Sequence, residues 1–213
     1  MTLEMSAPNP ARRDVIISKA LSYLLRHGAL KEKLSINELG YVKINDLLSH
    51  PRLKSSQVTR QDIERIVANN DKKRFTISND NQFICANQGH SIPQINNDNL
   101  IPLNFEDLKN FEIYHGTFKN KLSIIKQSGG LSRMNRNHIH FTCKEYNTIS
   151  GIKKHSNVLV YIDIGKCMEH GIKFYKSLNK VILTCGNEDG MIPWEFITKV
   201  VETNGHEINM DEI

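Results

Sequence analysis

Residues 74–85, Arg-Phe-Thr-Ile-Ser-Asn-Asp-Asn-Gln-Phe-Ile-Cys, decide how the N-terminal part of the chain folds. Residues 74–77 and 82–85 alternate between polar and apolar side chains, a pattern typical of strands with one buried face. The polar segment between them, residues 78–81, consists of residues that favour turns. This stretch therefore predicts a β-hairpin.

Helical patterns precede the hairpin. Residues 17–24 carry apolar side chains at helical spacing, and Gly28 follows where a left-handed glycine can end the helix. A short second helix is expected over residues 44–48, and Thr59 can cap a third. Three helices followed by a hairpin predict a winged helix-turn-helix, a shape that often docks on nucleic acid.

The C-terminal half is rich in short apolar segments, which predict strands in a largely antiparallel core. One helix is expected over residues 120–128, ended by Gly129 and Gly130. Strands are expected around residues 113–116, 138–142, 158–164, 181–185 and 197–202. The fold class predicted for the whole chain is α+β. The expected parts are a flexible tail (1–11), a winged-helix lobe (12–92), a linker rich in Pro and Asn (93–110) and a second lobe (111–213).

The positive charge lies in the N-terminal part. Of the 213 residues, 1–92 contain 14 Lys or Arg and 9 Asp or Glu, whereas 93–213 contain 14 of each kind, so the first part carries the whole net charge of +5. A localised excess of this kind favours a polyanionic partner such as nucleic acid.

Several classes of protein are excluded by what the sequence lacks. It has no G-x-G-x-x-G, no G-x-x-x-x-G-K-[ST], no H-E-x-x-H and no G-x-S-x-G motif. Its four cysteines form no C-x-x-C pair, so we expect no metal site, a reducing compartment, and cysteines packed as small hydrophobes. Neither a signal peptide nor a membrane-spanning segment is recognisable, and a cytoplasmic or nuclear location is expected.

Charged and polar clusters in the first lobe could carry chemistry. Arg26 and His27 follow each other at an expected helix end, where they could bind a phosphate and move a proton, or merely face solvent and cap the helix. Arg74 opens a strand and could point into a cleft, although a cationic run at a helix end is commonly solvated. Residues 88–91, Gln-Gly-His-Ser, could bind phosphate through backbone N–H groups or form a plain loop.

Two segments of the second lobe are candidates for a ligand site. In residues 115–117, His-Gly-Thr, the glycine would let a flat ligand approach the backbone, but a simple turn is equally compatible. Residues 136–141, Arg-Asn-His-Ile-His-Phe, would place His138 and His140 on one face of a strand. Those imidazoles could line a cleft or form a solvated pair.

Together these stretches resemble the tRNA 2′-phosphotransferase family, the NAD-dependent enzymes called KptA in bacteria. The resemblance extends from about Arg13 to Ile197. It is carried by residues 18–27, 70–75, 88–91, 115–117, 136–141 and 177–184, with Ile192-Pro193 following. It implies an N-terminal winged-helix RNA lobe and a C-terminal lobe with an ADP-ribosyltransferase-like fold.

The resemblance also implies a reaction in two steps. The 2′-phosphate at a tRNA splice junction attacks the nicotinamide-ribose C1″ of NAD, and nicotinamide leaves. The 2″-hydroxyl then attacks that phosphate, releasing 2′-hydroxyl RNA and ADP-ribose 1″,2″-cyclic phosphate. NAD is thus a co-substrate, tRNA the partner, no metal is involved, and the protein is expected to be a monomer. The alternatives are ADP-ribosylation of terminal nucleic-acid phosphates and a winged-helix nucleic-acid-binding protein without catalysis.

Residue roles follow from the same resemblance. The implied catalytic set is Arg26, His27, Arg74 and Arg136. The implied NAD-binding residues are His115, Gly116, Thr117, Ser132, Asn137, His138, His140 and Lys153. The expected RNA contacts are Lys19, Lys72, Lys73, Gln88, Gly89, His90 and Ser91. Lys153 stands where many members of the family have Arg, and lysine keeps the charge but loses the bidentate fork.

Overall fold

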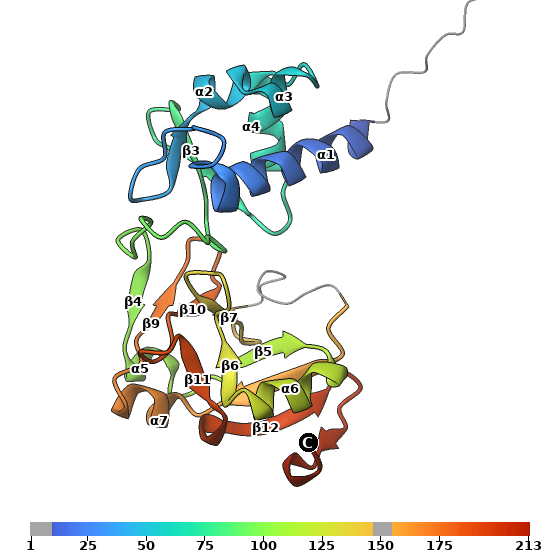
Figure 1. The fold of residues 1–213 in the computed structure, drawn as a ribbon, viewed down its shortest axis with the longest axis vertical. Coiled ribbons are helices and arrows are strands. Elements are labelled where there is room, and N and C mark those ends of the chain that lie inside the picture. Colours follow the sequence, from blue (N-terminus) through green and yellow to red (C-terminus); the bar gives the residue numbers. More distant parts are fainter. Residues whose placement is uncertain (1–9, 147–154) are drawn as a thin grey trace, which may run out of the picture. The chain divides into compact units, whose positions relative to one another are not determined.

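The computed structural model describes residues 10–146 and 155–213, which divide into two compact units. The first unit ends at Ala86 and the second begins at Asn87 (Figure 1). Each unit has helices and antiparallel sheets, so the predicted α+β class is confirmed. Within the described ranges, no helix has the length and apolar character needed to cross a bilayer.

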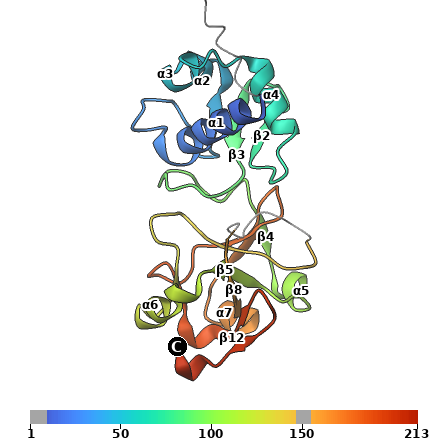
Figure 2. The same ribbon diagram turned by 90° about the vertical axis from the view of Figure 1, so that its right-hand side faces the viewer.

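From residue 10 onward, the first unit places four α-helices around a small antiparallel sheet of order β1-β3-β2 (Figures 1 and 2). Its helices are α1 (Pro10–Tyr23), α2 (Ile44–Ser49), α3 (Pro51–Lys54) and α4 (Arg60–Ala68). Its strands are β1 (Tyr41–Lys43), β2 (Phe75–Ile77) and β3 (Phe83–Ala86). The predicted hairpin is β2–β3, and β1 pairs with the other edge of β3.

Local capping and burial explain these elements. Thr59 and Asp62 form a capping box at the start of α4, as the sequence predicted for Thr59. Burial disfavours the charged form of Asp62, but hydrogen bonds from Thr59, Arg65 and Arg13 outweigh it and lower the pKa of this carboxyl. The largest fully buried side chains of this unit are Ile17, Leu21, Leu24, Leu25, Ile44, Leu47, Leu53, Ile63 and Ile84.

The predicted left-handed cap at Gly28 is wrong. Helix α1 continues directly into a π-helical turn, η1 (Leu24–Gly28), and Ala29 behind it is still in a right-handed helical conformation. Glycine is needed at position 28 for space instead, since a Cβ there would lie 2.5 Å from Cε1 of Tyr23. The requirement comes from packing against a ring and not from the backbone angle.

In its described residues, the second unit consists of short antiparallel strands in three groups, of orders β4-β9-β10-β7, β11-β6 and β13-β12-β8-β5. Most of these strands are labelled in Figure 1. The strands are β4 (Ile101–Leu103), β5 (Tyr114–Thr117), β6 (Gly130–Ser132), β7 (Ile139–Phe141), β8 (Val158–Ile162), β9 (Phe174–Lys176), β10 (Ile182–Thr184), β11 (Met191–Pro193), β12 (Ile197–Glu202) and β13 (Glu207–Ile208). A bridge between Tyr114 and Thr142 joins β5 to the end of β7.

Helices cover this second core. They are α5 (Phe105–Leu108), α6 (Leu122–Gln127) and α7 (Ile164–Glu169), with 3-10 turns at Lys119–Lys121, Trp194–Phe196 and Met210–Glu212. Helix α6 begins slightly later than expected, after one of those 3-10 turns, and it stops before Gly129 and Gly130, whose φ angles of 92° and 147° favour glycine. The five strands expected in this half are all present.

Residues 93–110 differ from the linker predicted for them. They contain β4, which pairs with β9, and α5, which packs against α7, and both belong to the second unit. The prolines and asparagines that suggested a linker have structural uses here. Pro102 lies on the edge strand β4, where a missing N–H is tolerated, and Asn104 forms a capping box with Asp107 at the start of α5.

Three of the four cysteines are buried as predicted. They are Cys85, Cys143 and Cys167. Cys185 is exposed just after β10, so the prediction is wrong for that residue. Burial raises the pKa of Cys85 and Cys143 to about 11, which keeps both thiols protonated at neutral pH.

Candidate functional site

The adjacent pair Arg26 and His27 lies on the π-helical turn η1 that follows α1. Arg26 is half-buried and His27 is exposed. Single π-helical turns at helix ends or within helices occur frequently at functional sites. The turn thus presents a guanidinium and an imidazole from two successive residues of one rigid element.

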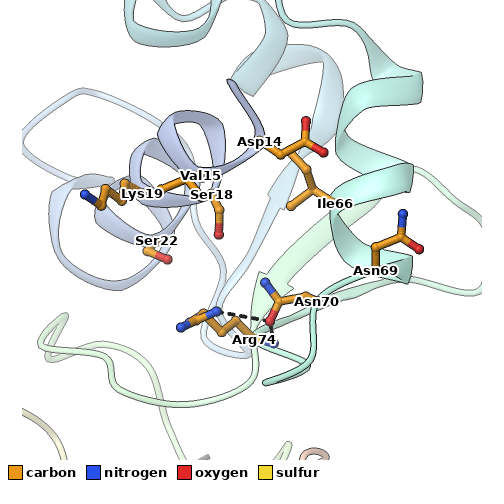
Figure 3. A pocket seen from close by; sticks show the side chains of 9 residues that line it. All are labelled: Asp14, Val15, Ser18, Lys19, Ser22, Ile66, Asn69, Asn70 and Arg74. Carbon is orange, nitrogen blue, oxygen red and sulfur yellow. Dashed lines mark hydrogen bonds between the residues drawn. The ribbon is translucent and has the colours of Figure 1, made fainter. Parts of the chain in front are cut away.

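Arg74 is held by a neighbouring side chain. It lies in the turn between α4 and β2, half-buried, and both its backbone N–H and its Nη1 donate to Oδ1 of Asn70, at 3.3 and 3.2 Å (Figure 3). The preceding Lys73 has a left-handed φ of 40°, and its N–H donates to the Asn70 carbonyl. The guanidinium of Arg74 is therefore fixed by the turn on which it sits.

Arg74 lines a pocket of about 400 Å³ between α1 and the end of α4. The lining residues are Asp14, Val15, Ser18, Lys19, Ser22, Ile66, Asn69, Asn70 and Arg74 (Figure 3). The two cations, Lys19 and Arg74, and the two hydroxyls, of Ser18 and Ser22, suit a polar anionic ligand. The carboxylate of Asp14 is already engaged by Arg65, at 2.7 Å.

Of the residues predicted from the sequence, this pocket brings together Lys19 and Arg74 only. Lys72 and Lys73 lie in the turn that leads to Arg74, half-buried and exposed respectively. Sequence reasoning missed Ser18 and Ser22. Their spacing of four residues on a predicted helix is a signal that could have found them, because it puts both hydroxyls on one face.

The segment 88–91 belongs to the second unit, although the sequence placed it with the first lobe. The Asn137 backbone N–H donates to the His90 carbonyl at 2.8 Å, which ties the segment to the start of β7. His90 is buried, and Gly89 has a left-handed φ of 88°. The side chain of Asn137 reinforces this contact, since its Nδ2 donates to the Ile92 carbonyl at 3.0 Å.

The residues 115–117 form the end of β5 rather than a free turn. Thr117 is buried, and Gly116 pairs with Leu159 of β8. Nδ1 of His115 lies 2.8 Å from the backbone oxygen of His140. This contact joins two of the segments that the sequence proposed for the ligand site.

His138 and His140 are both buried, with 7% and 8% of their surface exposed, which excludes the alternative of a solvated pair. Alternation along a strand cannot tell whether its second face is covered by another segment. Here both rings are buried, and Oδ1 of Asn97, from a distant segment, lies 2.8 Å from Nε2 of His138. Burial, with a smaller effect from the charge of Arg133, lowers the pKa of His138 to about 4. His138 is therefore neutral at pH 7.

Arg136 is exposed on a turn that its neighbours hold through the backbone. Nη1 of Arg133 donates to the Arg136 carbonyl at 2.8 Å, and the Arg133 N–H donates to the Gly190 carbonyl at 3.0 Å. The hydroxyl of Ser132 accepts from the N–H of Met134 at 3.0 Å. Hydrogen bonds from Arg133 thus hold the backbone of this turn, while the side chain of Arg136 is exposed to solvent.

Two further expectations concern Lys153 and metal ions. Lys153 lies outside the residues that the structure describes. Among those it does describe, no group of three or more His, Cys, Asp or Glu side chains is placed to hold a metal ion.

Comparison with known proteins identifies the family. Residues 12–186 match the model described as "RNA 2'-phosphotransferase, Tpt1 / KptA family". The chain belongs to this family. It is 44% identical over 201 residues to the tRNA 2′-phosphotransferase of Saccharomyces cerevisiae, a match that covers 89% of this chain and 84% of the relative. Among RNA 2′-phosphotransferase relatives it is also 42% identical over 193 residues to tRNA 2′-phosphotransferase 1 of Danio rerio (86% and 84% covered). It is 33% identical over 196 residues to a probable RNA 2′-phosphotransferase of Pseudomonas syringae pv. tomato (92% and 98% covered).

Proposed function

We propose that the protein transfers the splice-junction 2′-phosphate of tRNA to NAD. The products are 2′-hydroxyl tRNA, ADP-ribose 1″,2″-cyclic phosphate and nicotinamide. The observation that carries the proposal is the match to the RNA 2′-phosphotransferase family over residues 12–186. That span includes all four residues of the proposed catalytic set, Arg26, His27, Arg74 and Arg136.

The first unit is assigned to the RNA, as a winged-helix lobe. Its helices, its three-stranded sheet and the net positive charge of residues 1–92 support this assignment. Lys19, Lys72 and Lys73 are proposed to contact RNA phosphates, and Arg74 to bind the 2′-phosphate itself. The pocket beside Arg74 supports that role because its two serine hydroxyls can also hydrogen-bond an anionic group.

The second unit is assigned to NAD, as an ADP-ribosyltransferase-like lobe. The strands β5 and β7 support this role, since β5 carries His115–Thr117 and β7 carries His140, and a hydrogen bond and a β-bridge join them. His138 directly precedes β7. The buried, neutral His138 suits hydrogen bonding to a dinucleotide better than a charged imidazole would, because it carries no cost of burying a charge. Ser132 and Asn137 are proposed to fix the conformation of the turn between them, which would face the NAD. Ser132 accepts a hydrogen bond within that turn, and Asn137 donates one to the Ile92 carbonyl.

The proposed chemistry needs charge stabilisation more than a protein nucleophile. In the first step a phosphate oxygen bonds to C1″ as the bond from C1″ to the nicotinamide nitrogen breaks. In the second step the 2″-oxygen bonds to phosphorus, the bond to the RNA 2′-oxygen breaks, and the 2″-hydroxyl proton ends on that oxygen. His27 is proposed to orient or deprotonate the 2″-hydroxyl, and Arg26, Arg74 and Arg136 to stabilise the charge on the phosphate.

The direct test is nicotinamide release from NAD by the full chain with a short RNA that carries one internal 2′-phosphate. The same RNA with a 2′-hydroxyl is the matched control. We expect release with the first RNA only, together with a product of the mass of ADP-ribose cyclic phosphate. RNA binding without nicotinamide release would overturn the proposal in favour of a binding protein. An RNA that keeps ADP-ribose at a terminal phosphate would favour ADP-ribosylation instead.

A further inference from the structure

We infer that Asn70 is a positioning residue for Arg74, and that it prepares the guanidinium for the phosphate without touching the phosphate itself. The inference rests on the proposed function, because it takes the 2′-phosphate to be the ligand of Arg74. Its structural basis is the double hydrogen bond from Arg74 to one oxygen of Asn70 (Figure 3).

One acceptor atom holds both ends of Arg74. Oδ1 of Asn70 receives the backbone N–H at 3.3 Å and Nη1 at 3.2 Å, so the side chain curls back over its own turn. An unrestrained arginine loses up to about 2 kcal/mol of side-chain conformational entropy when it is immobilised. Because Asn70 restrains Arg74 before the ligand binds, the arginine side chain loses less conformational entropy on binding.

The rest of the turn explains why Asn70 can act in this way. Its main-chain carbonyl accepts from the N–H of Lys73 at 2.8 Å, and Lys73 takes a left-handed φ of 40°. The main chain and the side chain of Asn70 therefore both accept hydrogen bonds that hold the three residues between it and Arg74 in a turn. Asn70 itself is half-buried directly after α4, so the clamp is anchored to the end of a helix.

The neutral amide is the appropriate acceptor for an arginine that must bind an anion. It uses one N–H of a guanidinium that has five, and the others stay available. A carboxylate at the same position would hold Arg74 more strongly. It would also place a negative charge beside the guanidinium and compete with the dianionic phosphate.

The neighbouring Asn69 provides a matched control. It lines the same pocket and is exposed at the end of α4, but its side chain points away from Arg74 in Figure 3. Truncation of Asn69 removes an equal number of atoms from the same pocket without removing the hydrogen bonds to Arg74. Asn70→Ala and Asn69→Ala therefore differ mainly in the restraint on Arg74.

The first measurement is binding of the full chain, without NAD, to a short RNA with an internal 2′-phosphate and to the same RNA with a 2′-hydroxyl. We expect Asn70→Ala to lose about tenfold in its preference for the phosphorylated RNA and Asn69→Ala to keep that preference. Asn70→Asp should lose at least as much, because its charge competes with the phosphate. If the wild-type chain itself shows no preference for the 2′-phosphate, the proposed function fails. If the wild type shows it and Asn70→Ala retains it in full, only this inference fails.

A double-mutant cycle in the kinetics separates positioning from a general structural role. We expect Asn70→Ala to lower kcat/KM for the phosphorylated RNA about tenfold in the wild-type background and to have no further effect in an Arg74→Ala background. Equal losses in both backgrounds, or an equal loss from Asn69→Ala, would overturn the inference. Thermal unfolding of all variants, followed in parallel, shows whether any loss comes from misfolding.

Discussion

Arg74 and Arg136 belong to the same proposed catalytic set, but the chain holds them in different ways. In the first unit, the side chain of Arg74 is itself restrained, through its hydrogen bonds to Asn70. In the second unit, Arg133 and Gly190 hold the backbone of the turn, and the side chain of Arg136 stays exposed. A cation can therefore be positioned in two ways, by restraining its guanidinium or by restraining only the backbone that carries it.

The histidines show a related contrast. His27 is exposed on a helical turn, whereas His138 and His140 are buried within the second unit. An exposed imidazole can exchange protons with solvent and substrate near neutral pH. The buried, neutral His138 instead contacts the side chain of Asn97 in the same unit.

The largest expected effect concerns the two arginines themselves. We expect Arg74→Ala and Arg136→Ala each to lower the rate of the second step by about 10²–10³-fold, because charge builds on phosphorus there and one donor of this kind is typically worth that much. An ADP-ribosylated RNA intermediate should accumulate in both variants. Gel analysis of a single-turnover reaction detects it. A variant in which the substrate stays untouched at all times would contradict this division between the two steps.

The next prediction concerns the pH dependence of stability that the buried side chain of His138 should cause. Its pKa is about 4 in the folded protein and 6.5 for the unperturbed side chain, so between these values the unfolded chain binds a proton that the folded chain does not. Stability must therefore fall as the pH drops from about 6.5 to 4, by up to about 3 kcal/mol from this residue.

Denaturant unfolding at pH 7 and pH 5 checks this expectation. His138→Gln keeps a side-chain N–H for Asn97 but cannot titrate, so it should show a weaker loss of stability at pH 5 than the wild type. The same loss in both proteins would mean that His138 does not contribute to the acid sensitivity.

A smaller loss of activity is expected when the turn that carries Arg136 is disturbed by substitution of Gly190. A Cβ at Gly190, whose φ is 74°, would lie 2.5 Å from Nε of Arg133. Gly190→Ala should therefore displace Arg133 and lower the rate of phosphate transfer, by about tenfold if the Arg136 backbone shifts by a fraction of an ångström. Gly171→Ala is the matched control, because Gly171 has a φ of 78° but nothing within 4 Å of its Cβ position.

Both alanine substitutions place a side chain in a left-handed backbone conformation, but only the one at Gly190 creates a steric clash with Arg133. Unfolding measurements should give both variants a similar loss of stability from the left-handed conformation, about 1 kcal/mol. Only Gly190→Ala should lose activity. If Gly171→Ala loses as much, backbone strain alone accounts for the effect, and Arg133 has no part in holding the turn.

The elements that local sequence patterns predicted correctly have local causes. The capping box at Thr59, the hairpin β2–β3 and the glycines after α6 each depend on a few consecutive residues. The misreadings have a different origin. Residues 93–110 looked like a linker because a cap and an edge strand use the same residue types as a loop, and only pairing with β9 distinguishes them.

The candidate site shows the same limit. The proposed catalytic and NAD-binding residues came from the family resemblance, whereas the sequence pattern alone left each of them with a structural alternative. His138 and His140 were expected on an open face, because alternation reports which residues share a face and not whether another segment covers it. Asn70 was not singled out, since its contact with Arg74 depends on the conformation of the intervening turn.

The smallest expected effect is a change in stability at a residue with a left-handed backbone conformation. The turns that carry Arg74 and Arg136 each contain one such residue. Lys73 precedes Arg74 with a φ of 40°, and Met134 precedes Arg136 by two positions with a φ of 54°. Met134 has 77% of its surface exposed, so replacing it removes little packing. We expect Met134→Gly to stabilise the protein by about 0.5 kcal/mol, because relief of the left-handed strain slightly exceeds the entropic cost of glycine in the unfolded chain. Met134→Ala keeps the strain and should show no such gain in chemical denaturation. An equal gain for both variants would mean that removing an exposed methionine side chain, and not relaxing the backbone, is what stabilises the turn beneath Arg136.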